Sequence, residues 1–77
     1  MCQYIVHERG EVVLDGSRLR ELRLERGKST AEIGDLVGLS EAMVRHVENG
    51  LRNPDIASLK RLADCYGVTV DSLYKTS

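Results

Sequence analysis

Phenylalanine and tryptophan are absent from this sequence, and its only aromatic residues are Tyr4, Tyr66 and Tyr74. The hydrophobic core must therefore be built mainly from leucine, valine, isoleucine and alanine. A chain of 77 residues buries only about 60–65% of the surface that its unfolded state exposes, so it has few apolar side chains to spare. These shortages predict one small domain that uses every apolar face, with oligomerisation as a further source of buried surface.

Long apolar runs are also missing. No segment approaches the about 20 apolar residues that a membrane-spanning helix needs, and the first residues do not have the pattern of a secretory signal. We therefore expect a soluble, cytoplasmic protein that does not bind membranes. The 11 basic and 12 acidic side chains leave a formal charge of −1, which does not by itself indicate nucleic-acid binding. A DNA-binding protein of this composition would have to separate its basic and acidic residues onto different faces.

Cysteine is scarce. Cys2 and Cys65 are too few for a disulfide framework, and no C-x-x-C motif is present. A zinc site made of both cysteines with His7 and His46 can be imagined, but these four residues lack the spacing of helical metal ligands. The pattern favours reduced, structural cysteines and predicts neither a metal nor a cofactor.

Residues 1–14 form an N-terminal extension with a composition of its own, rich in valine, isoleucine and tyrosine. Residues 4–6 and 12–14 fit two short strands joined through residues 8–10, that is, a β-hairpin. A lone hairpin is only marginally stable in water, so this one would have to pack on the rest of the chain or pair with a second subunit. The alternative is a frayed tail.

Residues 15–77 show a helical apolar period, which predicts five helices joined by short connections. Ser29 and Glu32 match a capping box, Ser40 an N-cap, and Asp15 or Ser17 could cap the first helix. The fifth helix is short and begins at a capping Thr69. The side chains expected to face inward are Leu19, Leu22, Ile33, Leu36, Val37, Val44, Val47, Ile56, Leu59, Leu62, Ala63, Tyr66, Val70, Leu73 and Tyr74.

The connection between the second and third helices is very short. Gly38 and Leu39 alone join them, which is too tight for an antiparallel hairpin and predicts the steep crossing of a helix-turn-helix unit. Gly34 fits the same interpretation, because glycine inside a helix costs about 0.5–1 kcal/mol relative to alanine. Close packing against the third helix is a physical reason to accept that cost.

At this point the sequence resembles the Cro/repressor-type (Xre-like) helix-turn-helix DNA-binding family over residues 19–73. The stretches that carry the resemblance are "LRELRLERG", "STAEIGDLVGLS", "VRHVENGLRNPD" and "LKRLADCYGVTVDSL". The order of these segments is far more specific than one helix-turn-helix pattern. The resemblance implies an all-α, five-helix, lambda-repressor-like domain behind the strand-like extension.

The resemblance also implies a role for each matching position. Residues 40–48 would be the recognition helix in the major groove. Thr30 would lie against a phosphate at a helix start, and Asn49 and Arg52 would hold the backbone of the other strand. Arg23 and Glu48 would form a buried ion pair. The residues implied to contact DNA are Thr30, Ser40, Glu41, Ala42, Arg45, His46, Asn49 and Arg52.

The first turn of the recognition helix departs from the family. Many relatives carry glutamine at the position of Thr30 and serine, threonine or glutamine where this chain has Glu41 and Ala42. Glu41 could accept a hydrogen bond from cytosine, or could simply be a favourable acid in a first helical turn. Ala42 offers only a methyl group, which suits contact with the methyl group of thymine. Arg45 suits a bidentate guanine contact, unless it is only a solvated surface residue, and His46 could contact a base or a phosphate.

Three functions can be compared. A dimeric, sequence-specific transcriptional regulator, most simply a small repressor, is favoured, because two half-sites would offset weak binding by one near-neutral monomer. A regulatory protein partner is compatible with it. The alternative is a protein-interaction module that keeps the helix-turn-helix fold while DNA binding is weak or lost. An enzyme is least favoured, because no nucleophile–base pair or phosphate-binding loop can be assembled from these helices.

Overall fold

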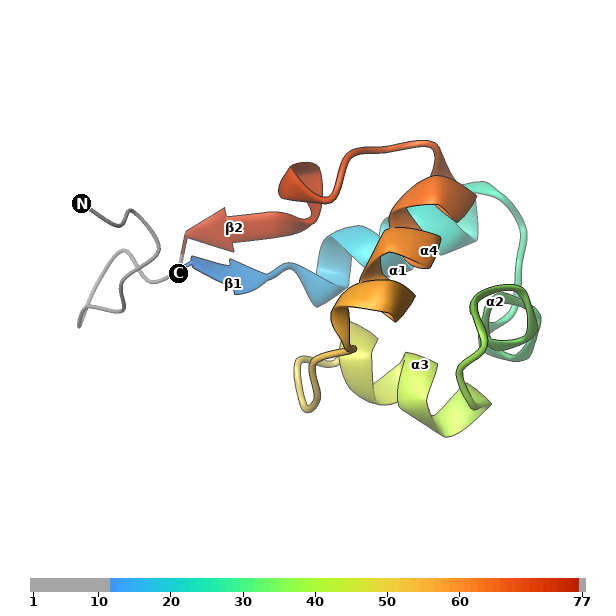
Figure 1. The fold of residues 1–77 in the computed structure, drawn as a ribbon. Coiled ribbons are helices and arrows are strands. Elements are labelled where there is room, and N and C mark those ends of the chain that lie inside the picture. Colours follow the sequence, from blue (N-terminus) through green and yellow to red (C-terminus); the bar gives the residue numbers. More distant parts are fainter. Residues whose placement is uncertain (1–11, 77) are drawn as a thin grey trace.

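A computed structural model describes residues 12–76. Four α-helices follow one another, and two short strands from opposite ends of the described chain pair beside them (Figure 1). The elements are β1 (Val12–Leu14), α1 (Gly16–Glu25), α2 (Thr30–Val37), α3 (Glu41–Glu48), α4 (Ile56–Tyr66), the 3-10 helix η1 (Asp71–Leu73) and β2 (Tyr74–Thr76). Within this part of the chain, no helix is long and apolar enough to cross a bilayer.

The starts of the helices follow the predicted capping residues. Ser29 and Glu32 form the complete capping box of α2, with each side chain bonded to the backbone N–H of the other. The Ser40 hydroxyl accepts a hydrogen bond from the backbone N–H of Met43 at 3.0 Å and caps α3. Of the two candidates for α1, Asp15 is the cap, since its carboxylate accepts from the N–H of Arg18 at 3.1 Å. These caps satisfy amides that the first helical turn leaves without partners.

The core is aliphatic, with one buried aromatic ring. Its members are Leu19, Leu22, Ile33, Val37, Val44, Val47, Leu59, Leu62, Ala63, Tyr66 and Leu73. Three expected members were predicted wrongly: Leu36 is 59% exposed, Ile56 65% and Tyr74 38%. The buried face of α2 is formed by Ile33, Gly34 and Val37, so Leu36 lies outside it. Ile56 is the first residue of α4, whose buried residues begin only at Ser58.

The prediction of five helices was also wrong. After α4 the chain makes only the single turn η1 and then extends as β2. The N-cap of η1 is Val70, which makes no side-chain cap hydrogen bond, and not the predicted Thr69. The Thr69 hydroxyl nevertheless accepts a hydrogen bond from the backbone N–H of Ser72 at 3.2 Å. The β-branched residues before the turn are poor helix formers, and Tyr74–Thr76 favour a strand. A mixed fold of four helices and a strand pair therefore replaces the all-α bundle.

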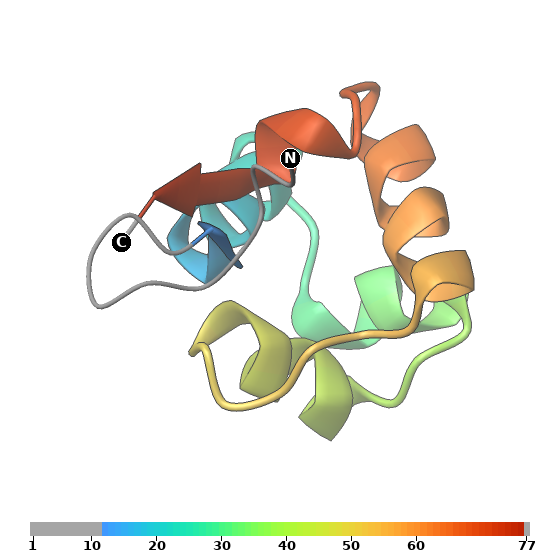
Figure 2. The same ribbon diagram turned by 60° about the vertical axis from the view of Figure 1, so that its left-hand side comes forward.

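Of the predicted N-terminal hairpin, only the second strand lies in the described residues. It is β1, and it pairs antiparallel with β2, with Val12 opposite Thr76 and Leu14 opposite Tyr74. The backbone N–H of Asp15 donates to the carbonyl of Leu73 at 2.7 Å and anchors this pair to η1. The first predicted strand, residues 4–6, lies outside the described residues, as do Cys2 and His7. Figures 1 and 2 show the strand pair at one end of the molecule, with α3 on the side away from η1.

Tyr66 joins α4 to the end of α1. Arg26 lies over its ring, with the guanidinium carbon 5.3 Å from the ring centroid, and donates to its backbone carbonyl. The side chain is buried, with 1% exposed, and its hydroxyl has no hydrogen-bond partner among the described residues. Burial, helped by the negative charge of Glu48, raises the pKa of Tyr66 to about 12.

Alkaline pH should therefore destabilise the domain through Tyr66. Between the unfolded pKa of about 10 and the folded pKa of about 12, the unfolded chain loses the phenol proton while the folded chain keeps it. Two pKa units correspond to about 2–3 kcal/mol, so the free energy of unfolding should fall by up to that amount across this range. Urea denaturation at several pH values measures the fall. Tyr66→Phe should flatten it, and an equal slope in that variant would contradict the assignment.

Candidate nucleic-acid interface

The turn between α2 and α3 sets the tilt of the third helix. Gly38 has φ +78° and ends α2 in the left-handed region, and the N–H of Leu39 donates to the carbonyl of Gly34 at 2.8 Å. A Cβ on Gly34 would collide with the carbonyl oxygen of Leu39. The two helices therefore approach through backbone, and Figure 1 shows α2 almost end-on while α3 runs across the view.

Helix α3 has one buried and one open face. Val44 and Val47 are each 3% exposed and anchor the helix on the core. The opposite face is formed by residues implied to meet DNA. The exposed members are Ser40, the N-cap of α3, then Glu41, Ala42 and Arg45 on α3, and Asn49 and Arg52 just after it. Thr30 at the start of α2 and His46 on α3 are partly buried. A duplex can thus reach most of the set without being blocked by residues 12–76.

A buried ion pair braces the end of α3. Arg23 of α1 donates from Nε to Glu48 Oε2 at 2.8 Å and from Nη2 to Oε1 at 3.0 Å. Its remaining nitrogen, Nη1, donates to the carbonyl of Lys28 at 2.9 Å. The two side chains are 12% and 6% exposed, and the bidentate hydrogen bond to Glu48 raises the pKa of Arg23. The pair fixes α3 and the loop before α2 to the same helix.

A second charged contact lies on the open face. Arg45 Nη1 is 2.9 Å from Glu41 Oε2, one turn earlier on α3. The same carboxylate oxygen accepts a hydrogen bond from the Thr30 hydroxyl at 3.2 Å. Three of the residues implied to contact DNA therefore contact one another in the free protein, an arrangement that the sequence analysis did not anticipate.

A hollow of about 240 Å³ opens beside this contact. Arg20 of α1 lines it together with Arg45, Thr30 and Asn49, and the Arg23–Glu48 pair borders it. Arg20 was missed by the sequence analysis, although it lies one turn before Arg23 on the same helix and is exposed. The helical spacing between Arg20 and Arg23 was the signal that could have placed Arg20 near this surface. The hollow is lined by cationic and polar hydrogen-bond donors and lies at the start of α2. The N-terminus of a helix favours anions, so this position suits an anion.

Cys65 is a free thiol that packs against the core. Within residues 12–76, no cluster of three histidine, cysteine or acidic side chains could hold a metal ion. The zinc ligands imagined from the sequence include Cys2 and His7, which lie outside this range.

The helix-turn-helix geometry agrees with comparisons to known proteins. A sequence model described as a helix-turn-helix domain matches residues 16–73. The chain belongs to this helix-turn-helix family. It is 41% identical over 56 residues to the HTH-type transcriptional regulator DdrOP3 of Deinococcus deserti, covering 73% of this chain and 43% of the regulator. It is 36% identical over 56 residues to AnsR of Bacillus subtilis, covering 73% of this chain and 48% of AnsR. The chain thus spans less than half the length of these two regulators.

Solved structures of helix-turn-helix proteins share the fold. The P22 c2 repressor in complex with a synthetic operator matches with a TM-score of 0.76 at 26% identity, covering 79% of this chain and 92% of the repressor. The biofilm regulator SinR in complex with DNA matches at 0.68 and 29% identity, covering 75% and 94%. The restriction-modification controller protein C.AhdI from Aeromonas hydrophila matches at 0.69 and 36% identity, covering 75% and 88%. The resemblance to repressor-type helix-turn-helix proteins is confirmed.

Proposed function

We propose that this helix-turn-helix protein is a sequence-specific DNA-binding transcriptional regulator that reads the major groove with α3. The observation that carries the proposal is the division of α3 into a face held in the core by Val44 and Val47 and an exposed face bearing Glu41, Ala42 and Arg45. Similarity to HTH-type transcriptional regulators, to the P22 c2 repressor in complex with a synthetic operator and to SinR in complex with DNA supports it. A role as a repressor in the cytoplasm, on the nucleoid, belongs to the same proposal.

The position of each polar residue on this face indicates which part of the DNA it would contact. Arg45 would read guanine, and Arg20, Thr30 and Asn49 would hold a phosphate in the hollow between α1, α2 and α3. Arg52 is exposed in the loop after α3, where a second phosphate contact fits. Ser40 supports the interface mainly as the cap of α3, since its hydroxyl oxygen already accepts from the backbone. His46 is partly buried at the edge of the face and would contact the groove wall.

Paired arginine variants test this division between base and phosphate. Duplexes would first be selected from random DNA, and affinities then measured by mobility shift at several salt concentrations. Arg45→Ala should cost about 1–3 kcal/mol on a selected duplex and relax the preference at one position per half-site. Arg20→Ala should weaken all duplexes alike and reduce the salt slope by about one.

Arg18→Ala is the matched control, because Arg18 lies on another side of α1 and is engaged with Glu21 at 3.9 Å. It should leave affinity and salt slope close to those of the wild type. If the wild-type protein retards no duplex even at low salt, the proposal fails and the protein-interaction module becomes the better explanation. The similar protein SinR has been solved in complex with SinI. We therefore include a regulatory protein partner in the proposal.

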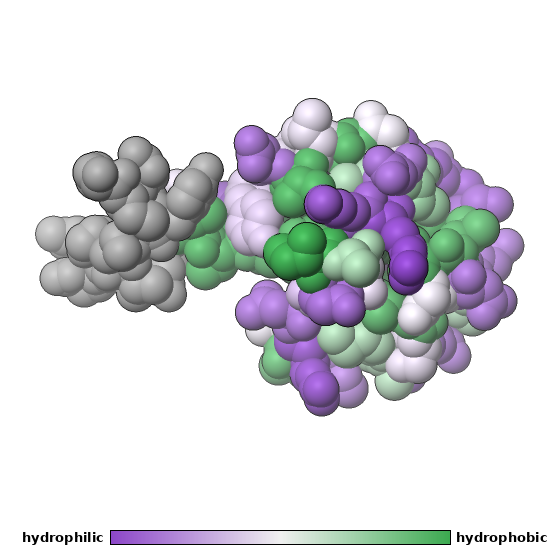
Figure 3. Space-filling model, viewed as in Figure 1, coloured by the Kyte–Doolittle hydropathy of each residue, from purple (hydrophilic) through white to green (hydrophobic). Residues whose placement is uncertain are grey.

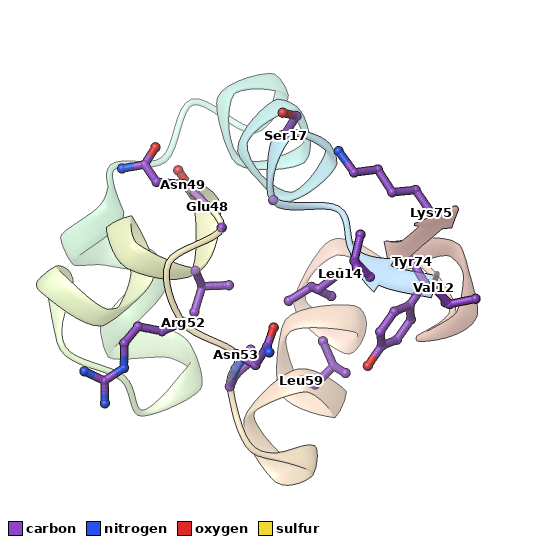
Figure 4. A pocket seen from close by; sticks show the side chains of 15 residues that line it. Val12, Leu14, Ser17, Glu48, Asn49, Arg52, Asn53, Leu59, Tyr74 and Lys75 are labelled. Atoms are coloured by element: carbon purple, nitrogen blue, oxygen red, sulfur yellow. The ribbon is translucent and has the colours of Figure 1, made fainter. Parts of the chain in front are cut away.

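Dimerisation is proposed as part of this function, because one α3 offers few positive charges. The strand pair is the preferred surface for a second copy. Among residues 12–76, β1 and β2 form a sheet of two strands, which is marginal alone. Beside it lies a hollow of about 650 Å³ between Val12 and Tyr74 of the strands and Arg52 and Asn53 of the loop after α3 (Figure 4). Hydrophobic side chains gather where the sheet meets the helices (Figure 3). Analytical ultracentrifugation across protein concentrations tests the proposal.

A further inference from the structure

Glu41 makes two side-chain contacts on the open face of α3. Its Oε2 receives both the guanidinium of Arg45 at 2.9 Å and the hydroxyl of Thr30 at 3.2 Å. The side chains of Arg45 and Glu41 are 52% and 53% exposed, so the pair is open to an approaching duplex. α3 carries no other arginine or lysine. The carboxylate therefore neutralises the only permanently charged cation of α3.

This pairing has different consequences on different DNA sequences. A phosphate can draw Arg45 away only by leaving the Glu41 carboxylate unpaired in a strongly negative groove. A guanine can accept both nitrogens of Arg45 while a neighbouring cytosine donates its amino group to Glu41, so that both charges regain partners. The pair should thus weaken binding wherever the bases do not satisfy Arg45 and Glu41 together.

We propose that Glu41 is a specificity-determining residue that acts against non-specific DNA, by holding Arg45 until a site satisfies both side chains. This inference depends on the proposed DNA-binding function. It differs from simple base reading by Glu41, because it predicts that removal of the charge strengthens binding to random sequence. It also differs from general repulsion between a carboxylate and phosphates, because the effect must pass through Arg45.

Glu41→Gln tests the proposal while keeping the shape of the side chain. The variant should bind a random-sequence duplex about three- to tenfold more tightly at low salt, with a salt slope steeper by about one, because Arg45 becomes free for a phosphate. Its affinity for the selected duplex should stay level or fall. The ratio of selected to random affinity should therefore drop by at least about three- to tenfold.

Two controls separate the proposal from general charge effects. Asp35→Asn removes a carboxylate from an exposed position of α2 that forms no ion pair with any described residue, and it should raise both affinities slightly and equally. In an Arg45→Ala background, Glu41→Gln should have no larger effect than Asp35→Asn. Equal gains from Glu41→Gln with and without Arg45, or an unchanged affinity ratio, would overturn the role of Glu41 and leave the DNA-binding function standing. Wild-type protein that binds no duplex would overturn both.

Discussion

Replacing Glu48 with alanine should lower the free energy of unfolding by about 3 kcal/mol. The change leaves the Arg23 guanidinium, 12% exposed, without the partner that holds two of its nitrogens. Removing one member of a buried ion pair costs about 3–5 kcal/mol, and the partial exposure of Arg23 places the expected loss near the lower end. A domain of this size is stable by only about 4–12 kcal/mol. Urea denaturation followed by circular dichroism measures the loss.

The matched control is Glu21→Ala. Glu21 belongs to a surface pair with Arg18, in which the closest atoms are 3.9 Å apart and the Glu21 side chain is 66% exposed. Pairs of this kind contribute about 1 kcal/mol or less, so the control should be almost neutral. A double variant, Arg23→Leu with Glu48→Leu, should lose less stability than Glu48→Ala, because it buries no unpaired charge. Equal losses from Glu48→Ala and Glu21→Ala would show that the buried pair stabilises no more than a surface pair.

Gly34→Ala should destabilise the domain by about 1–3 kcal/mol, although alanine is the better helix former. At an exposed helical site the same exchange gains about 0.5–1 kcal/mol. Here the new methyl group would meet the backbone carbonyl of Leu39, which cannot rotate away like a side chain, and overpacking has a cost of this size. Thermal and urea unfolding would reveal the sign.

Asp35→Ala serves as the control for Gly34→Ala, because Asp35 is the next residue of α2 and is exposed. It should change stability little. Gly34→Ala should also weaken DNA binding beyond its effect on folding, since a wider turn changes the tilt of α3. A Gly34→Ala protein as stable as the wild type would mean that the turn gives way at little cost, contrary to the packing described above.

Local signals allowed much of the fold to be predicted. The capping box at Ser29, the cap at Ser40 and the tight turn at Gly38 depend on residues close in sequence, and the structure contains all three. The position of β2 could not be predicted in this way. Its strand forms only because Val12–Leu14, some sixty residues earlier in the chain, lies alongside it, and a helical pattern of three apolar residues cannot reveal such a partner.

The site shows the same division. Helical spacing indicated which residues of α3 face outward, whereas the contact among Thr30, Glu41 and Arg45 requires the actual angle between two helices. Gly16 illustrates the limit most clearly. Nothing in the sequence around it suggests close packing, yet a Cβ there would collide with the backbone at the end of α3. Close approaches between distant backbone segments are set by tertiary structure. The approach of Gly34 to Leu39 could be predicted because the two residues are only five positions apart in the sequence.

The antiparallel register of Val12 with Thr76 joins the two ends of the described chain in one place. A polypeptide fused before β1 and another fused after β2 would therefore leave the domain from the same pole. Figure 1 shows that this pole is at the end of the molecule, beside α1 and away from the turn that joins α2 to α3. Fluorescent labels attached at Val12 and at Thr76 would therefore report from the same location.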